Sequence, residues 1–155
     1  MFTISTIKEI ATDLHKKGKK IVLATGFFDL LHTEHINFLQ KARAVGDVLI
    51  VAVESDERAR ILKGEGRPVE TQAVRLKNLT PYVDYLIALD ATFNNPLAFE
   101  SLIAAVKPQI LAVSSHTAHQ DKKSALVTKY GGELRVVHTH NPDISTSKLL
   151  AQNHV

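Results

Sequence analysis

The residues best suited to chemistry lie in one short stretch, which reads Thr25-Gly26-Phe27-Phe28-Asp29-Leu30-Leu31-His32-Thr33-Glu34-His35. His32 and His35 stand three residues apart where a helix is expected to begin, and the free N–H groups and positive dipole of a helix start favour an anion. Two imidazoles there suit a polyphosphate, because its transition state needs hydrogen-bond donors on the transferring group. Gly26 lets the backbone come close to a ligand. The alternative is a pair of structural histidines, one capping the helix and one half buried.

This stretch resembles a known signature. Gly26–His35 is similar to the GxFDxxHxGH motif of the cytidylyltransferase-like nucleotidyltransferases, and the likeness continues from Lys20 to Leu150. Later segments resemble further motifs of that family, in the same order: Lys63-Gly64-Glu65-Gly66-Arg67-Pro68-Val69, Tyr82-Val83-Asp84 and Ile144-Ser145-Thr146-Ser147. The resemblance implies transfer of a CMP or AMP moiety from an NTP to a phosphorylated sugar or polyol, with release of pyrophosphate.

The resemblance also implies roles for single residues. His32 and His35 would hold the triphosphate as charge moves toward the departing pyrophosphate, and Lys63 would reach the phosphates from a second loop. Mg²⁺ would arrive with the nucleotide, and no covalent nucleophile is implied, so the rate would come from positioning and electrostatics. On spacing alone, Lys63 can equally be a solvated lysine, and the hydroxyl residues an ordinary helix cap. The implied nucleotide-binding residues are Gly26, Phe27, Phe28, Ser145, Thr146 and Ser147.

Several positions depart from the family pattern. Phe27 stands where relatives carry a small residue, and Glu34 replaces the glycine of the HxGH motif. His116 falls in a region that is glycine-rich and ends in Asp in relatives, and His140 takes the place of an arginine. These changes leave open a second function, in which the protein binds a nucleotide or phosphorylated ligand without turnover. An active enzyme would have to turn Glu34 outward or use it on an acceptor.

Some site residues have a structural or metal-binding alternative. Asp29 is expected to brace its loop rather than to react, and Arg75 is not assigned to the site. The four imidazoles and the carboxylate in the candidate loops suit a divalent transition metal such as zinc, nickel or copper. In the alternative interpretation they bind phosphate or water. The residues concerned are His32, Glu34, His35, His116 and His140.

Strands that alternate with helices are expected to position these residues. The pattern predicts strands at 21–24, 48–53, 82–89, 110–113 and 134–138, and helices at 7–14 behind a Ser5 cap, 35–45, 55–62, 71–79, 96–106, 122–130 and from Ser145 or Thr146 to Gln152. This alternation predicts one Rossmann-like α/β domain, with an N-terminal helix in 1–18 and a core in 20–152. Its five-stranded parallel sheet would carry helices on both faces. Such sheets bind ligands beyond the carboxyl ends of their strands.

Composition excludes several other classes. The chain has 155 residues, 45% apolar and 23% charged, as in one globular domain. Its formal net charge is +3, but the basic cluster at 16–20 has no interleaved aromatic residues, so no nucleic-acid partner is expected. Val48–Val53, the longest apolar run, is far shorter than the ~20 residues of a membrane span. The lack of cysteine and of a signal-like N-terminus favours the cytoplasm, and the resemblance implies a homodimer.

Overall fold

The computed structural model describes residues 1–141 and 143–153. Its strands are β1 (Ile21–Gly26), β2 (Val48–Val53), β3 (Tyr85–Ala88), β4 (Ile110–Ser114) and β5 (Glu133–His138). Its helices are α1 (Ile4–Lys16), α2 (Thr33–Ala44), α3 (Asp56–Lys63), α4 (Gln72–Leu79), α5 (Pro96–Val106), α6 (Gln120–Lys129) and α7 (Thr146–Asn153), with a 3₁₀ turn at Thr80–Tyr82. None of the helices described has the length and apolar character needed to cross a membrane.

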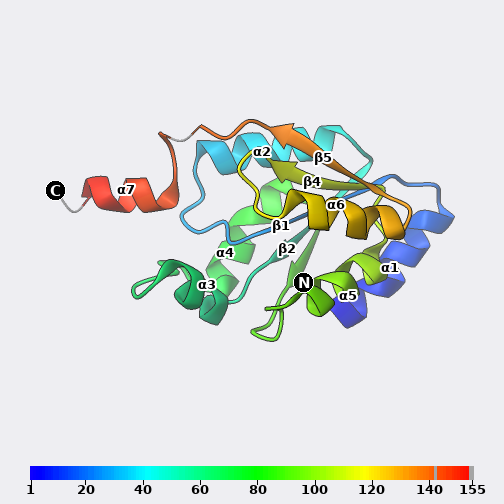
Figure 1. The fold of residues 1–155 in the computed structure, drawn as a ribbon, viewed down its shortest axis with the longest axis horizontal. Helices are drawn as coiled ribbons and strands as arrows, with labels where there is room; N and C mark the ends of the chain where they lie inside the picture. Colours follow the sequence, from blue (N-terminus) through cyan, green and yellow to red (C-terminus); the bar gives the residue numbers. More distant parts are fainter. Residues whose placement is uncertain (142, 154–155) are drawn as a thin grey trace.

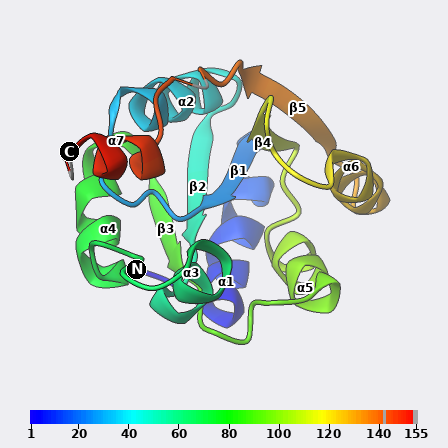
Figure 2. The same ribbon diagram turned by 60° about the vertical axis from the view of Figure 1, so that its left-hand side comes forward.

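The strands form one parallel sheet in the order β3-β2-β1-β4-β5, with helices on both faces, which confirms the predicted fold class. Figures 1 and 2 show α1 and α5 on one side of this sheet and α2 and α4 on the other. Side chains alternate accordingly along β1: Ile21 and Leu23 pack with α1, α5 and α6, whereas Val22 and Ala24 pack with α2 and α4. A strand covered on both faces needs apolar residues at every position, and β2 and the first four residues of β1 have them.

The ends of some elements differ from the prediction. Thr3 caps α1 instead of Ser5, because the Thr3 hydroxyl accepts from the Thr6 N–H while the Thr6 hydroxyl accepts from the Thr3 N–H. This reciprocal pair satisfies two N–H groups at the helix start. Helix α2 begins at Thr33, slightly earlier than expected.

Strand β3 is shorter than the predicted strand at 82–89. The 3₁₀ turn at Thr80–Tyr82 occupies its predicted start, and the strand begins after Asp84. The Asp84 carboxylate accepts from the Leu49 N–H at 2.8 Å and from Arg43 at 2.9 Å. The aspartate thus ends the turn and begins the pairing of β3 with β2.

The sheet opens where its strand order reverses. β1 pairs with β2 along its whole length, but it pairs with β4 only at Val22↔Ile110 and Leu23↔Leu111. Beyond these positions β1 and β4 separate, and the β4–β5 register shifts between Val113 and Ser114. Parallel sheets bind ligands at such a reversal, so the carboxyl ends of β1 and β4 are where a site is expected.

Candidate active site

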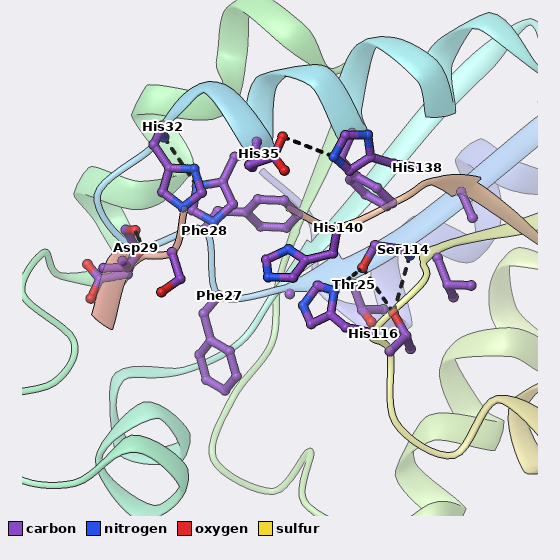
Figure 3. Close-up of a pocket in the computed structure, with 18 of the residues that line it drawn as sticks. Thr25, Phe27, Phe28, Asp29, His32, His35, Ser114, His116, His138 and His140 are labelled. Atoms are coloured by element: carbon purple, nitrogen blue, oxygen red, sulfur yellow. Dashed lines mark hydrogen bonds and ion pairs between the residues drawn. The ribbon is translucent and has the colours of Figure 1, made fainter. Parts of the chain in front are cut away.

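A cavity of about 290 Å³ lies at the carboxyl ends of β1 and β4 (Figure 3). All the residues singled out from the sequence as site residues line it: Gly26, Phe27, Phe28, Asp29, His32, Glu34, His35, Lys63, His116, His140, Ser145, Thr146 and Ser147. Thus the fold brings together loops that lie far apart in the sequence. The sequence assigned no site role to several other lining residues, among them Arg67, Phe99, Thr117, Lys123 and His138.

The loop after β1 is braced by Asp29. This carboxylate is 2% exposed and accepts from the backbone N–H groups of Val69 at 2.8 Å and Glu70 at 3.0 Å. It also accepts from Arg67 Nε at 3.1 Å. Burial alone would raise the pKa of Asp29, but these donors outweigh it and lower the pKa. Asp29 is therefore an ionised anchor between the β1–α2 loop and the segment before α4.

Gly26 and Phe28 position the ring of His35 through packing contacts. Phe28 has a left-handed backbone, with φ of 54°, and its ring folds back over β1. A Cβ at Gly26 would lie 2.9 Å from the Phe28 ring, so glycine leaves the space that the ring needs. The ring then meets His35 edge-on, with centroids 5.5 Å apart. Gly26 thus serves a packing role in addition to any approach of backbone to ligand.

His32 and His35 form a stacked pair at the start of α2. Their ring centroids are 3.7 Å apart, with 17° between the planes. The backbone N–H of His32 donates to His35 Nδ1 at 3.3 Å, so the proton of a neutral His35 ring is on Nε2. Burial, followed by the nearby charges of His32 and Lys63, lowers the pKa of His35 to about 3. His35 is therefore a neutral N–H donor at physiological pH.

His32 contributes a polar atom without a protein partner. Its Nδ1 is buried, and no residue within the described ranges makes a hydrogen bond to it. Burial also lowers the pKa of His32, more than Glu34 raises it. A buried polar atom without a partner costs free energy, so this nitrogen is suited to a ligand in the cavity.

Glu34 lines the cavity, and its carboxylate is bound by groups at the end of β5. The carboxylate is 9% exposed and accepts from His138 Nε2 at 3.1 Å and from the Asn141 N–H at 2.7 Å. Lys41 Nζ lies 3.0 Å from His138 Nδ1, and since an ammonium only donates, the His138 proton is on Nε2. Burial would raise the pKa of Glu34, but Asn141 and His138 lower it. Glu34 is therefore not turned out to solvent, and its hydrogen bonds tie α2 to the β5–α7 loop.

The start of α7 docks against the loop after β1. The Thr146 hydroxyl donates to the Asp29 carbonyl at 2.5 Å, so its proton is already used within the protein. Arg67 Nη1 donates to Ser147 Oγ at 2.9 Å, which leaves the Ser147 hydroxyl proton for a ligand. Ser145 precedes the helix and also lines the cavity. Of the three hydroxyl residues, Thr146 holds the helix in place.

Phe27 and Lys63 meet at the mouth of the cavity. Lys63 is the last residue of α3, and its ammonium lies 5.2 Å from the centroid of the Phe27 ring. The face of an aromatic ring attracts a cation, so Phe27 positions this charge. Partial loss of water around the ammonium, followed by the charge of Arg67, lowers the pKa of Lys63. Phe27, the bulky residue where relatives carry a small one, is therefore in contact with the Lys63 ammonium.

His116 and His140 form a second ring pair. Their centroids are 3.9 Å apart, and His140 lies between the first histidine pair and His116 (Figure 3). His116 Nδ1 shares a hydrogen bond of 2.7 Å with the Ser114 hydroxyl. Residues 1–141 and 143–153 contain no group of three or more His, Asp or Glu arranged to hold a metal ion. The transition-metal hypothesis therefore finds no support in these residues.

Arg75 lies outside the cavity and supports it. The side chain is fully buried and donates to the Phe27 carbonyl at 2.8 Å, to the Glu70 carbonyl at 3.1 Å and to the Asp56 carboxylate at 2.7 Å. It thus joins the β1–α2 loop to α3 and to the start of α4. For Arg67, its place inside the second family-like motif was a signal in the sequence. No feature of the sequence indicated that Lys123 lines the cavity, because a lysine in an amphipathic helix is usually solvent-exposed.

Comparison with solved structures supports the fold. The lipopolysaccharide core biosynthesis protein from Thermoplasma volcanium GSS1 superposes with a TM-score of 0.62 at 27% identity, over 81% of this chain and 100% of that one. Pantoate-beta-alanine ligase from Francisella tularensis superposes with a TM-score of 0.63, over 99% of this chain and 76% of that one. Because its identity is 15%, the latter match concerns the fold alone.

Sequence comparison assigns the family. The bifunctional protein HldE of Desulfatibacillum aliphaticivorans is 34% identical over 150 residues, which are 95% of this chain and 29% of that protein. HldE of a Nitratiruptor species is 46% identical over 107 residues, 68% of this chain and 22% of that protein. The chain thus spans less than a third of these relatives. The model of the family described as cytidylyltransferase-like matches residues 23–151, and the chain belongs to that family.

Proposed function

We propose that this chain transfers a nucleotidyl group, CMP or AMP, from an NTP to a phosphorylated sugar or polyol and releases pyrophosphate. One observation carries the proposal: the stacked His32–His35 pair faces the cavity at the start of α2. His35 offers a neutral Nε2–H, and His32 has a buried Nδ1 without a partner in the described chain. Ser147 and the start of α7 lie in the same cavity, so donors meet where a polyphosphate would bind.

The reaction needs no protein nucleophile. An oxygen of the acceptor phosphate attacks the α-phosphorus, and the bond from that phosphorus to the bridging oxygen of pyrophosphate breaks. The acceptor oxygen is already ionised at neutral pH, so no general base is required. Negative charge builds on the departing pyrophosphate, where His32, His35 and Lys63 would stabilise it. Catalysis then rests on alignment and on donors that are already oriented before the reaction.

Mg²⁺ fits this site as a part of the substrate. Of the described residues that line the cavity, the carboxylates are Asp29 and Glu34. The Asp29 carboxylate already accepts hydrogen bonds from Arg67 and two backbone N–H groups. The Glu34 carboxylate likewise accepts from His138 and Asn141. Mg²⁺ is commonly bound by substrate phosphates and water with few protein ligands. When bound, the ion would neutralise phosphate charge, and the protein's own donors would complete that neutralisation.

Binding without turnover is the alternative function. It rests on the departures from the family pattern at Phe27, Glu34, His116 and His140, among which a carboxylate near triphosphate would oppose nucleotide binding. The Glu34 carboxylate is hydrogen-bonded to His138 and Asn141 within the protein, although it still acts electrostatically on His32 and His35. These bonds reduce one obstacle to nucleotide binding, which both functions require.

A substrate panel tests the proposal. The protein is incubated with Mg²⁺, with CTP, ATP, GTP or UTP, and with a set of sugar and polyol phosphates, and pyrophosphate is measured. We expect release of pyrophosphate that requires both an NTP and a phosphorylated acceptor. Tight NTP binding with no pyrophosphate from any pair would instead support the binding function.

We further propose that the protein acts as a homodimer, on the family resemblance alone. Sedimentation velocity of the purified chain measures this directly. A mass of about twice the 17.1 kDa chain is expected, and a monomer at all concentrations would contradict it.

A further inference from the structure

The cavity has a second end, formed by β4, α5 and α6. Phe99 of α5, Thr117 of the β4–α6 loop and Lys123 of α6 line it there. Helices α5 and α6 pack on the face of the sheet opposite to α2 and α4 (Figure 2). The proposed reaction assigns no role to this end.

Lys123 is a half-buried cation without a close counter-ion. Its ammonium lies 5.7 Å from the centroid of the Phe99 ring, and in the described part of the chain it has neither a hydrogen-bond acceptor nor a carboxylate within 4.0 Å. Burial lowers the pKa of Lys123, and the more distant Glu54 partly opposes this shift. Glu54 itself lies 3.9 Å from Arg58. A cation in this setting favours an incoming anion.

The other cations of the cavity lie toward its first end or are paired. Lys63 rests on Phe27 and acts electrostatically on His35 and also on His116. Arg67 donates to Asp29 and Ser147. Among the described lysine and arginine side chains that line the cavity, Lys123 therefore remains for a second anionic group.

The geometry of nucleotidyl transfer identifies the second anionic group that Lys123 would bind. The attacking and leaving oxygens must be roughly in line on opposite sides of the reacting phosphorus. If pyrophosphate departs toward His32, His35 and the start of α7, the acceptor must approach from the opposite end. A phosphate monoester carries about −1.5 to −2 charges at pH 7, so its approach to a triphosphate needs a cation.

We propose that the end formed by β4, α5 and α6 is the acceptor subsite, where Lys123 holds the phosphate of a sugar or polyol phosphate and Phe99 packs against its carbon skeleton. This inference rests on the proposed function. One acceptor oxygen forms the new bond to the α-phosphorus, and the electron pair of the broken bond leaves with pyrophosphate. Lys123 keeps its protons throughout, so it aligns and neutralises the acceptor without acting as an acid.

The test compares two neighbouring lysines. Lys123→Met removes the charge and keeps an apolar side chain, and Lys122→Met is the matched control, since Lys122 is exposed and does not line the cavity. Calorimetry measures binding of glycerol 3-phosphate and glucose 1-phosphate in the presence of a saturating α,β-methylene NTP analogue. A charge-assisted hydrogen bond is worth ~1.5–3 kcal/mol, so Lys123→Met should weaken binding of the phosphate probe roughly 10- to 100-fold. Binding of the analogue itself should change less than about twofold.

Kinetics gives the second readout. With any accepted pair, Lys123→Met should raise KM for the acceptor and leave KM for the NTP unchanged, whereas Lys123→Arg should restore much of the loss. Weakened analogue binding with unchanged probe binding would overturn the proposal, because Lys123 would then belong to the nucleotide site. Equal probe binding by wild type and Lys123→Met, or no probe binding by wild type, would overturn it as well. Failure of the proposed function is a separate result, in which both ligands bind and no pyrophosphate forms.

Discussion

At the scale of single residues, the chemistry depends on two imidazoles whose protonation the fold determines. The sequence predicted His32 and His35 as the phosphate-binding pair from their spacing. It did not predict that the rings stack or that His35 is held as an Nε2–H donor, because both depend on the backbone of the β1–α2 loop. The neutral donor is available without any proton uptake.

Removing either imidazole should nearly abolish turnover. Loss of one preorganised donor to the reacting group typically lowers the rate by about 10²–10³, so His32→Ala and His35→Ala should each show a loss of that order. His119→Asn is the control, since His119 is exposed and outside the cavity, and asparagine tolerates its left-handed backbone. Turnover is measured as pyrophosphate release, and circular dichroism verifies folding. Full activity in both alanine variants would refute the role of the pair.

The low pKa of His35 predicts a loss of stability in acid. The folded-state pKa is about 3, whereas an unperturbed histidine has a pKa of about 6.5. Between these values the unfolded chain binds a proton that the folded chain does not bind, so the free energy of unfolding falls as pH decreases through this range. Urea unfolding at pH 7.5 and 5 should therefore show a smaller decrease for His35→Gln than for wild type. Equal decreases, or an NMR titration of His35 near pH 6.5, would contradict the assignment.

At the scale of elements, Glu34 connects two segments that no pattern in the sequence pairs. Its departure from the family motif was visible, but its partner His138 lies 104 residues away. The predicted parallel sheet brings the carboxyl end of the strand at 134–138 to the same edge as the loop after the first strand, but it does not show the contact between Glu34 and His138. The hydrogen bonds to His138 and Asn141 hold the segment that leads to α7.

Substituting Glu34 should loosen that segment and weaken nucleotide binding. Hydrogen bonds to charged groups contribute ~1.5–3 kcal/mol, so Glu34→Gly should destabilise the protein by about this amount. It should also raise KM for the NTP more than it changes kcat. Glu34→Gln retains an oxygen for the Asn141 N–H and should show a smaller effect. Hydrogen exchange of residues 139–141 and 143–147 measures the loosening, and tighter NTP binding by Glu34→Gly would show that the carboxylate only obstructs the site.

At the scale of the whole molecule, the sequence predicted the fold well. Apolar runs such as Val48–Val53 and the alternation with helices indicated a parallel sheet covered on both faces, and the structure has it. The predicted start of the third strand was wrong, because residues 80–82 form a 3₁₀ turn and strand β3 begins only after Asp84, whose carboxylate accepts from the Leu49 N–H. Buried Arg75 was also not anticipated as a link between segments, since its acceptors are largely backbone carbonyls whose positions only the fold determines.

Arg75→Leu should destabilise the whole domain. The change leaves the Phe27 and Glu70 carbonyls without this donor, and a buried unsatisfied group costs about 1–3 kcal/mol. Arg60→Leu, at an exposed position of α3, is the control and should shift stability far less. Urea denaturation of both variants measures the difference. Equal midpoints for Arg75→Leu and wild type would show that this arginine does not hold the loops together.

The most direct test of nucleotidyl transfer is phosphorus NMR of a complete reaction with the NTP and acceptor that release pyrophosphate. Transfer to a phosphate oxygen predicts a new pyrophosphate-diester signal from the product, in equal amount to free pyrophosphate, and loss of both with His35→Ala. Orthophosphate with a nucleoside diphosphate, or pyrophosphate with free nucleoside monophosphate and no new diester, would contradict transfer to a phosphorylated acceptor.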